Sequence, residues 1–238
     1  MYWLFKSSIG RKLVMSISGL FLILFLTFHV CMNLVALFSV EAYNMICAFL
    51  GANWYALAGT LVLAGGALIH ILYAFILYFQ NRKARGNNAY EVTRKPKNVE
   101  WASQNMLALG IAVATFLVLH CYNFWAKMQL VEILHKVGAH VDESVFSKAQ
   151  DGAYHIAATF SCPVYVLLYL AGLGALWFHL THGFWSALQT MGINGKIWFN
   201  RWKWIGNIYV TLLILGFAVV VLVFFIKSFC CCGIVCGI

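Results

Sequence analysis

Five long apolar runs constrain the fold of this 238-residue chain more than any other feature of its sequence. A helix that crosses a bilayer needs about 20 predominantly apolar residues. Only 10% of the residues are charged, whereas a soluble domain carries about 25%. We therefore expect an all-α integral membrane protein with one transmembrane domain over residues 1–238, a bundle of five helices. The predicted spans cover about residues 13–38, 54–80, 101–126, 162–190 and 205–229.

Basic residues are distributed unevenly between the two ends of these spans. With five spans, the N-terminal tail and the second and fourth connections share one side, and they hold 12 of the 16 lysines and arginines. The positive-inside rule then predicts a cytoplasmic N-terminus and an external C-terminus. This orientation also explains the net charge of +9 without a nucleic-acid partner. The basic loops either serve orientation alone or also dock a cytoplasmic partner.

One histidine lies inside each of the first four runs, at His29, His70, His120 and His179. A polar group in hydrocarbon costs several kcal/mol unless it is satisfied, so a histidine inside a span is a functional hypothesis. Counting about 1.5 Å per residue places His29 and His120 near the outer ends of their helices. The same count places His70 and His179 near the inner ends. We therefore predict two pairs, each formed by two helices that run in the same direction.

Two axial imidazoles complete the coordination of haem iron, and the cores of helix bundles are common cofactor sites. We predict that His29 and His120 ligate an outer haem b, and that His70 and His179 ligate an inner one. The haems are not attached covalently, because the sequence has no CxxCH motif. Zinc fits less well because it takes four ligands, and a proton relay would add carboxylates, which the spans lack. The alternative for any one histidine is a hydrogen bond between helices.

Several other residues are candidates for lesser roles. The propionates of the inner haem need cations and hydrogen-bond donors, for which the candidates are Arg11, Lys12, Ser16 and Trp101; membrane anchoring is the alternative for each. His182 follows His179 by one turn, where it could contact a haem edge or a lipid headgroup.

Two further expectations concern packing. Residues Val131–Val145, in the long third connection, are predicted to form one short helix at the outer surface. Small residues let helices, or a flat ring, approach closely, and we expect this of the glycines at 59, 65, 66, 172 and 174.

Taken together, these residues resemble the cytochrome b membrane anchor of succinate:quinone oxidoreductases, in its one-chain, five-helix, two-haem form. The resemblance rests on SSIGRK at residues 7–12, FHVCMNL around His29, EAYN at residues 41–44, FHLTHGFW around His179, and the 19-residue spacing from Trp101 to His120. One histidine on each of the first four helices is the ligand pattern of that family.

The resemblance implies a subunit of a quinol:fumarate reductase or succinate dehydrogenase in the bacterial cytoplasmic membrane. It would pass electrons between menaquinone or menaquinol and an iron–sulfur subunit. That subunit and an FAD-carrying flavoprotein would lie on the cytoplasmic side and perform the dicarboxylate chemistry, in an assembly that could be a dimer of heterotrimers. The aromatic outer end favours fumarate reduction in an anaerobe.

In that family quinol is oxidised close to the outer haem. The first connection offers Asn33 and Asn44 as candidate quinone contacts, and Glu41 as the candidate base because it is the only carboxylate there. A solvated loop residue is the alternative for Glu41. The alternatives for the whole chain are a cytochrome b subunit of a hydrogenase or formate dehydrogenase, which often has two ligands on one helix, and a non-redox transporter or scaffold.

Overall fold

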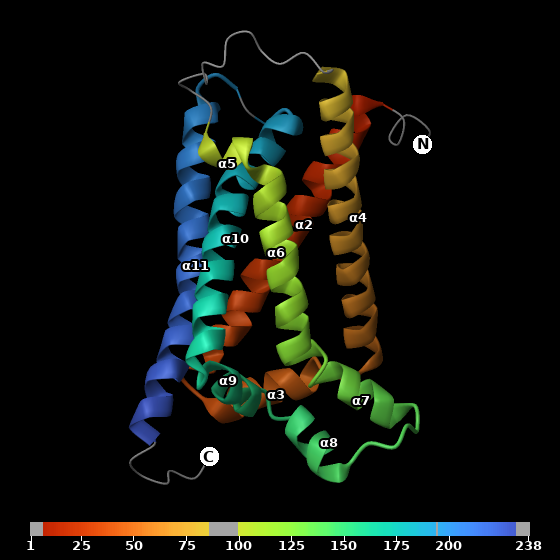
Figure 1. Cartoon of the computed structure of the whole chain (residues 1–238), viewed down its shortest axis with the longest axis vertical. Coiled ribbons are helices and arrows are strands. Elements are labelled where there is room, and N and C mark those ends of the chain that lie inside the picture. The colour runs from red at the N-terminus through yellow and green to blue at the C-terminus, as the bar shows by residue number, and fades with distance from the viewer. Residues whose placement is uncertain (1–6, 86–99, 194, 232–238) are drawn as a thin grey trace.

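The structure, a computed structural model, describes residues 7–85, 100–193 and 195–231, and this part of the chain is 86% helical without strands. Five helices are long and apolar enough to cross a membrane, and they form an elongated bundle (Figure 1). They are α2 (Ser8–Val35), α4 (Trp54–Arg85), α6 (Met106–His120) with the π-helical turn η1 (Cys121–Trp125), α10 (Pro163–Thr190) and α11 (Trp198–Cys231). The prediction of an all-α bundle with five helices that are long and apolar enough to cross a membrane is confirmed.

The helix boundaries differ from the predicted spans where local capping decides them. Helix α2 begins at Ser8 because the Ser7 hydroxyl accepts the Gly10 N–H at 2.9 Å, a typical N-cap. The third span does not begin at Trp101. Residues Trp101–Gln104 form a separate helix, α5, and α6 starts after the non-helical residue Asn105 (Figure 1).

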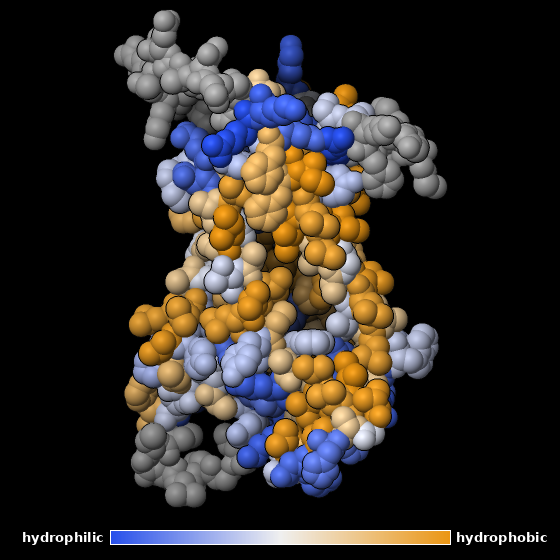
Figure 2. Space-filling model, turned by 45° about the vertical axis from the view of Figure 1, so that its right-hand side comes forward, coloured by the Kyte–Doolittle hydropathy of each residue, from blue (hydrophilic) through white to orange (hydrophobic). Residues whose placement is uncertain are grey.

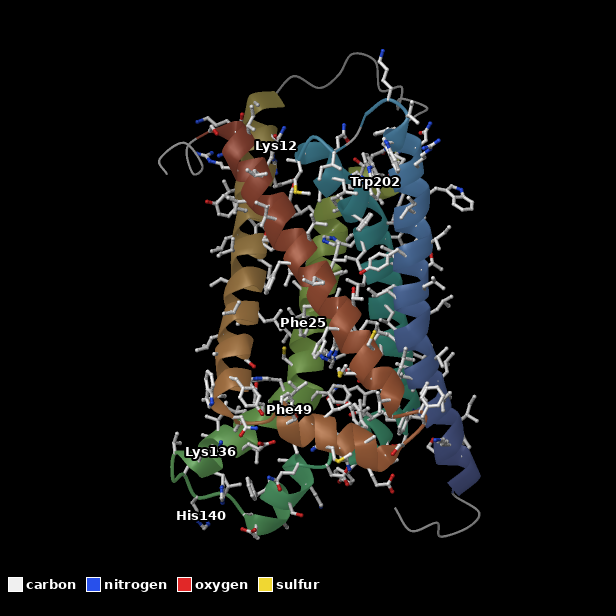
Figure 3. All side chains as sticks on the ribbon, turned by 180° about the vertical axis from the view of Figure 1, so that it is seen from behind. Lys12, Phe25, Phe49, Lys136, His140 and Trp202 are labelled. Carbon is white, nitrogen blue, oxygen red and sulfur yellow. The ribbon has the colours of Figure 1, made fainter. Side chains whose placement is uncertain are left out.

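Helix α2 is inclined across the bundle and changes neighbours along its length (Figures 1 and 3). In its first half Gly19 lies against His70 of α4. In its second half the Thr27 hydroxyl hydrogen-bonds the Tyr209 hydroxyl of α11. One helix thus joins α4 to the core, which is built mainly by α2, α10 and α11.

Four short helices lie at the end of the bundle where α4 begins and α11 ends (Figure 1). They are α3 (Val40–Phe49), α7 (Gln129–Lys136), α8 (Glu143–Ala149) and α9 (Gly152–Phe160). The prediction of one helix over Val131–Val145 is wrong, because Gly138 adopts φ +81° after α7 and separates it from α8. The Asn44 side chain joins α3 to α9, since it donates to Asp151 at 2.9 Å and accepts the Ala153 N–H at 3.0 Å.

The exterior carries an apolar middle zone between more polar ends (Figure 2). Lys12 and Trp202 lie at one end, and Lys136 and His140 lie at the other (Figure 3). Residues 1–6 and 86–99, which hold part of the predicted basic surface, lie outside the described residues.

Helix α4 stands apart from most of the bundle. None of its most apolar 18-residue window is buried, and its close backbone neighbour among the long helices is α2. Figure 2 shows the molecular surface hollowed in the middle of the apolar zone. Helix α4 therefore exposes most of its apolar surface in this chain.

The predicted small-residue positions divide into two kinds. A Cβ at Gly66 would lie 2.7 Å from the Phe21 ring and one at Gly172 would lie 2.4 Å from the Phe116 ring, so these glycines permit close helix packing. Gly59, Gly65 and Gly174 instead face open space, since a Cβ added at any of them would meet no neighbouring helix within 4 Å.

Candidate functional site

The structure brings the four intramembrane histidines together in two pairs. The ring centroids of His29 (α2) and His120 (α6) are 5.7 Å apart, and those of His70 (α4) and His179 (α10) are 6.3 Å apart. These are the pairs that the depth argument predicted. Neither α2 with α6 nor α4 with α10 is among the helix pairs with extensive close backbone contact, so each pair meets across a space between helices.

The ring separations match those of two imidazoles that share a metal ion. A bond of about 2 Å from each imidazole nitrogen to a first-row metal places the nitrogens about 4 Å apart and the ring centroids about 6 Å apart. The ring planes are nearly perpendicular, at 87° and 71°. Both pairs therefore have a ring separation compatible with two imidazoles that share one metal ion.

The two pairs lie at different heights in the bundle. On α2, Ser18 contacts His70 and lies eleven residues before His29, about 16 Å along the helix axis. On α10, Tyr169 contacts His120 and lies ten residues before His179, about 15 Å along the axis. The distances counted along α2 and along α10 agree. The two pairs are separated by about half the thickness of a bilayer core.

The His29–His120 pair is enclosed by aromatic rings. Phe25 stacks on His29 at 5.4 Å and Phe217 lies 5.6 Å from it. His120 contacts three rings of its own, those of Phe116, Phe124 and Tyr169. This environment excludes water from the pair and fixes both imidazoles by packing.

A π-helical turn follows His120 immediately. Such turns are rare and occur frequently at functional sites. The turn buries Asn123 completely, and its amide donates to the Tyr169 hydroxyl at 3.3 Å. The π-helical turn thus places Asn123 against Tyr169, whose ring also contacts His120.

The His70–His179 pair is held differently, by hydrogen bonds of His70 with Ser18 and with the Met15 backbone, and by one close glycine. The Ser18 hydroxyl lies 3.1 Å from His70 Nδ1, and a Cβ at Gly19 would lie 3.1 Å from His70 Cε1. His179 Nδ1 is buried and has no hydrogen-bond partner among the described residues. A buried imidazole nitrogen without a partner is costly. A further group that bonds to His179 Nδ1 would therefore stabilise this pair.

The contacts of Ser18 define the proton position on His70. Its hydroxyl donates to the Met15 carbonyl at 3.0 Å, and the Met15 backbone also hydrogen-bonds His70. We therefore assign the proton of the His70 ring to Nδ1, which faces Ser18. The lone pair of the neutral ring is then on Nε2. A metal-ligating histidine normally donates its other N–H to such a partner, which orients the ring and raises its basicity.

The residues present fit haem iron better than a metal ion held by protein alone. No group of three or more His, Cys, Asp or Glu capable of binding a metal occurs among the described residues. Two imidazoles suffice for haem because the macrocycle supplies the other four nitrogens. His179 Nδ1 is buried and has no hydrogen-bond partner among the described residues, so this ring nitrogen is not engaged by the protein.

The candidate propionate contacts gather at the Lys12 end of the bundle. Ser16 is buried in α2, whereas Lys12 is exposed. Trp101 is 58% exposed, and its ring packs on Phe178 at 5.2 Å, next to His179 in sequence. Arg11 lies in the first turn of α2 at the same end. The four residues thus share an end of the bundle. Among them, Trp101 contacts Phe178, the residue that precedes His179.

His182 belongs to a charged cluster and not to a third histidine pair. Its Nδ1 lies 3.4 Å from Glu100 Oε2, and Lys203 Nζ lies 2.6 Å from Glu100 Oε1. Lys203 also lies over the Trp185 ring at 4.4 Å. Burial alone raises the pKa of Glu100, but the hydrogen bonds and charges of Lys203 and His182 outweigh this and lower it.

The candidate quinone residues of the first connection are engaged in local structure. The Asn33 amide donates to the His29 carbonyl at 2.8 Å, beside the outer pair, while Asn44 joins α3 to α9. Glu41 is exposed in the first turn of α3, and its own backbone N–H and the Ser39 hydroxyl bond to it and lower its pKa. Glu41 is therefore a weaker proton acceptor than an ordinary carboxylate.

Two residues in these surroundings were not predicted. Ser18 carried a signal, since it is a polar residue inside an apolar run like Ser16. Tyr169 gave no such signal, because tyrosines are common at the ends of spans.

No family model matches the chain, and neither a curated protein nor a solved structure matches it.

Proposed function

We propose that this chain is a dihaem cytochrome b membrane subunit that carries electrons between a membrane quinone and a partner protein. The observation that carries the proposal is the presence of two histidine pairs, at 5.7 and 6.3 Å between ring centroids, at two heights in one bundle. His29 with His120, and His70 with His179, would hold the irons. Haem iron bound by two imidazoles has no open position, and it supplies one-electron transfer.

The residues around each pair have separable tasks in this proposal. Phe25, Phe217 and the rings beside His120 exclude water and keep the outer imidazoles facing one another. Ser18 holds the proton of His70 on Nδ1 and leaves Nε2 free to ligate. Low polarity around both pairs favours cofactors of small net charge.

Within this proposal the N-terminus is cytoplasmic, and the Lys12 end of the bundle faces an iron–sulfur subunit and an FAD-carrying flavoprotein. The activity of the complex is quinol:fumarate reductase or succinate dehydrogenase in a bacterial cytoplasmic membrane, with menaquinone as the membrane substrate. The resemblance of SSIGRK, FHVCMNL, EAYN and FHLTHGFW to that family supports this finer assignment. The contact of His182 with Glu100 favours it over a hydrogenase or formate dehydrogenase subunit, in which two ligands often share one helix.

The decisive experiment is the absorbance spectrum of the purified chain, oxidised and reduced, with haem content from the pyridine haemochrome. We expect two haem b per chain and low-spin spectra of two-imidazole coordination. A chain that is folded and free of haem would be a non-redox membrane protein, and the proposal would be lost. Purification from native membranes identifies the partners, and an accompanying flavoprotein with an iron–sulfur protein is the expected result.

A further inference from the structure

A pocket of about 340 Å³ lies between η1, α7, α8, α9 and the first turn of α10. This volume falls in the range of sites for small organic molecules. Part of its wall is apolar, and part is aromatic or polar. The apolar wall includes Val131, Val145 and Ala158, while Tyr154, Thr159 and Tyr165 contribute rings and hydroxyls. Such a lining suits a flat ring that carries hydroxyl groups.

His155 lines this pocket and has an unsatisfied nitrogen. The residue is only 7% exposed, and its Nε2 is buried with no hydrogen-bond partner among the described residues. Burial lowers the pKa of His155 and outweighs the opposing effect of a hydrogen bond at the Lys148 backbone. Lys127 lowers this pKa further and Asp151 raises it, both by smaller effects. The imidazole is therefore neutral at pH 7.

The direction of the hydrogen bond between His155 and the Lys148 backbone shows whether His155 Nε2 is a donor or an acceptor. A hydrogen bond that raises the pKa of an imidazole is one that the ring donates, so the bond at Lys148 is to its carbonyl oxygen. Because Nε2 has no partner, the donor is Nδ1. A neutral imidazole with its proton on Nδ1 carries a lone pair on Nε2, so Nε2 accepts a hydrogen bond, and a proton, from a ligand hydroxyl.

The charges around the pocket favour a ligand that becomes an anion. Lys127 and Lys148 both line it, and no carboxylate does among the described residues. The ammonium groups lie over the rings of Tyr122 and Tyr154, at 5.3 and 5.7 Å from the ring centroids. Both lysines are exposed, and cations beside a pocket stabilise negative charge as it develops on an ionising oxygen.

The pocket lies close to the His29–His120 pair, and an exposed apolar residue of α10 lies next to one of its lining residues. Tyr165 in the pocket wall precedes Tyr169 by one turn of α10, about 6 Å, and the Tyr169 ring lies 6.2 Å from the His120 ring. Next to Tyr165, Val164 is 62% exposed at the start of the same long apolar helix. A ligand with an apolar tail could thus extend its tail along α10 while its ring occupies the pocket.

We propose that this pocket binds the ring of a lipid-soluble quinol, with one quinol hydroxyl donating to His155 Nε2 and the oxygens facing Lys127 and Lys148. This inference rests on the proposed function for the identity of the electron acceptor. Oxidation of the quinol to the quinone releases two protons and two electrons. His155 Nε2 takes the first proton, water at the pocket opening takes the second, and the electrons leave one at a time to the haem iron proposed beside His120.

The proposal moves the quinol away from the first connection, where the resemblance suggested Glu41, Asn33 and Asn44. Glu41 is exposed and weakened as a base, and Asn44 is occupied between α3 and α9. His155 combines a free acceptor atom, enclosure and neighbouring cations, and it lies in the connection between the third and fourth spans.

Direct binding to the purified chain in detergent tests the pocket without requiring turnover. The probe is 2-heptyl-4-hydroxyquinoline N-oxide, a fluorescent flat ring with an acidic hydroxyl and an apolar tail, titrated by fluorescence quenching. We expect His155→Ala to weaken binding about tenfold, the effect of one lost hydrogen bond to an ionising group. Ala158→Trp should also weaken binding at least tenfold by filling the pocket from its wall, without disturbing a buried residue.

The matched controls are His140→Ala and Glu41→Gln, which alter an exposed histidine and the alternative base. Both should bind the probe within twofold of the unaltered chain. If Glu41→Gln weakens binding while His155→Ala and Ala158→Trp do not, the pocket assignment is overturned; absence of binding by the unaltered chain overturns it as well. Haem content measured on the same samples separates the two proposals, since a haem-free chain with His155-dependent binding would refute only the cytochrome assignment.

Discussion

The two histidine pairs have similar ring separations but are positioned by different means. His29 and His120 are fixed by five aromatic neighbours and a π-helical turn. His70 and His179 depend on Ser18, on Gly19 and on a helix, α4, that is largely exposed. Packing by many rings tolerates the loss of one contact better than a site that depends on a few hydrogen bonds to one ring. We therefore expect the His70–His179 site to respond more strongly to small substitutions nearby.

The largest expected effect is the selective loss of one haem when a ligand is removed. His120→Ala should lower the haem content from two to one per chain and spare the His70–His179 site, because each iron depends on its own pair. His70→Ala should spare the other site. The measurement is haem content together with redox titration, which resolves the two centres, and His140→Ala is the control. If His29→Ala and His120→Ala affected different centres, the pairing would be wrong.

A smaller but still site-specific effect is expected from Gly19→Val. A Cβ at this position already lies 3.1 Å from His70 Cε1, and the two methyl groups of valine displace the ring. The His70–His179 centre should lose most of its haem, while the His29–His120 centre keeps its own. Gly59→Val is the control, since nothing lies within 4 Å of that position. Equal haem loss in both variants would point to general destabilisation of the helices.

Removal of one supporting hydroxyl should have a more moderate effect. Ser18→Ala removes one of the two hydrogen-bond partners of His70 and leaves the Met15 backbone, and loss of such a partner typically costs about 10- to 100-fold in metal affinity. Haem dissociation from this site should become at least tenfold faster, and its midpoint potential should rise because the imidazole donates less electron density. Ser18→Thr should restore both values. Thr115→Ala, whose hydroxyl bonds only to Ile111 of its own helix, should change neither.

The smallest expected effect concerns the charged cluster near the inner site. The pKa of Glu100 is lowered in the folded chain, so its ion pair with Lys203 stabilises the fold above the ordinary pKa of 4.5. This contribution is lost as the pH falls from 4.5 through the lowered value. Because Glu100 is 40% exposed, the contribution is below about 1 kcal/mol.

Thermal unfolding in detergent at pH 7 and at pH 3 measures this contribution. Glu100→Gln should lower the melting temperature slightly at pH 7 and make no difference at pH 3. A difference that is as large at pH 3 as at pH 7 would show that packing, and not the charge, is responsible.

Much of the bundle follows from local properties of the chain. The apolar runs located all five long helices, and the helical rise per residue placed His29 level with His120 and His70 level with His179. The break at Asn105, the short helices α3 and α9, and the separation of α7 from α8 at Gly138 were not predicted. Those features depend on caps and backbone angles of single residues, which apolar periodicity does not report.

The sequence by itself determined the five potential spans and the heights of the four histidines, because hydrophobic length and helical rise are properties of each segment alone. Only the tertiary structure decided that Ser18 bonds His70 while Ser16 does not, and that His155 lines a pocket with Lys127 and Lys148. These outcomes depend on the tilt of α2, on the rotation of each helix about its axis, and on contacts between residues far apart in the chain. No single segment carries that information.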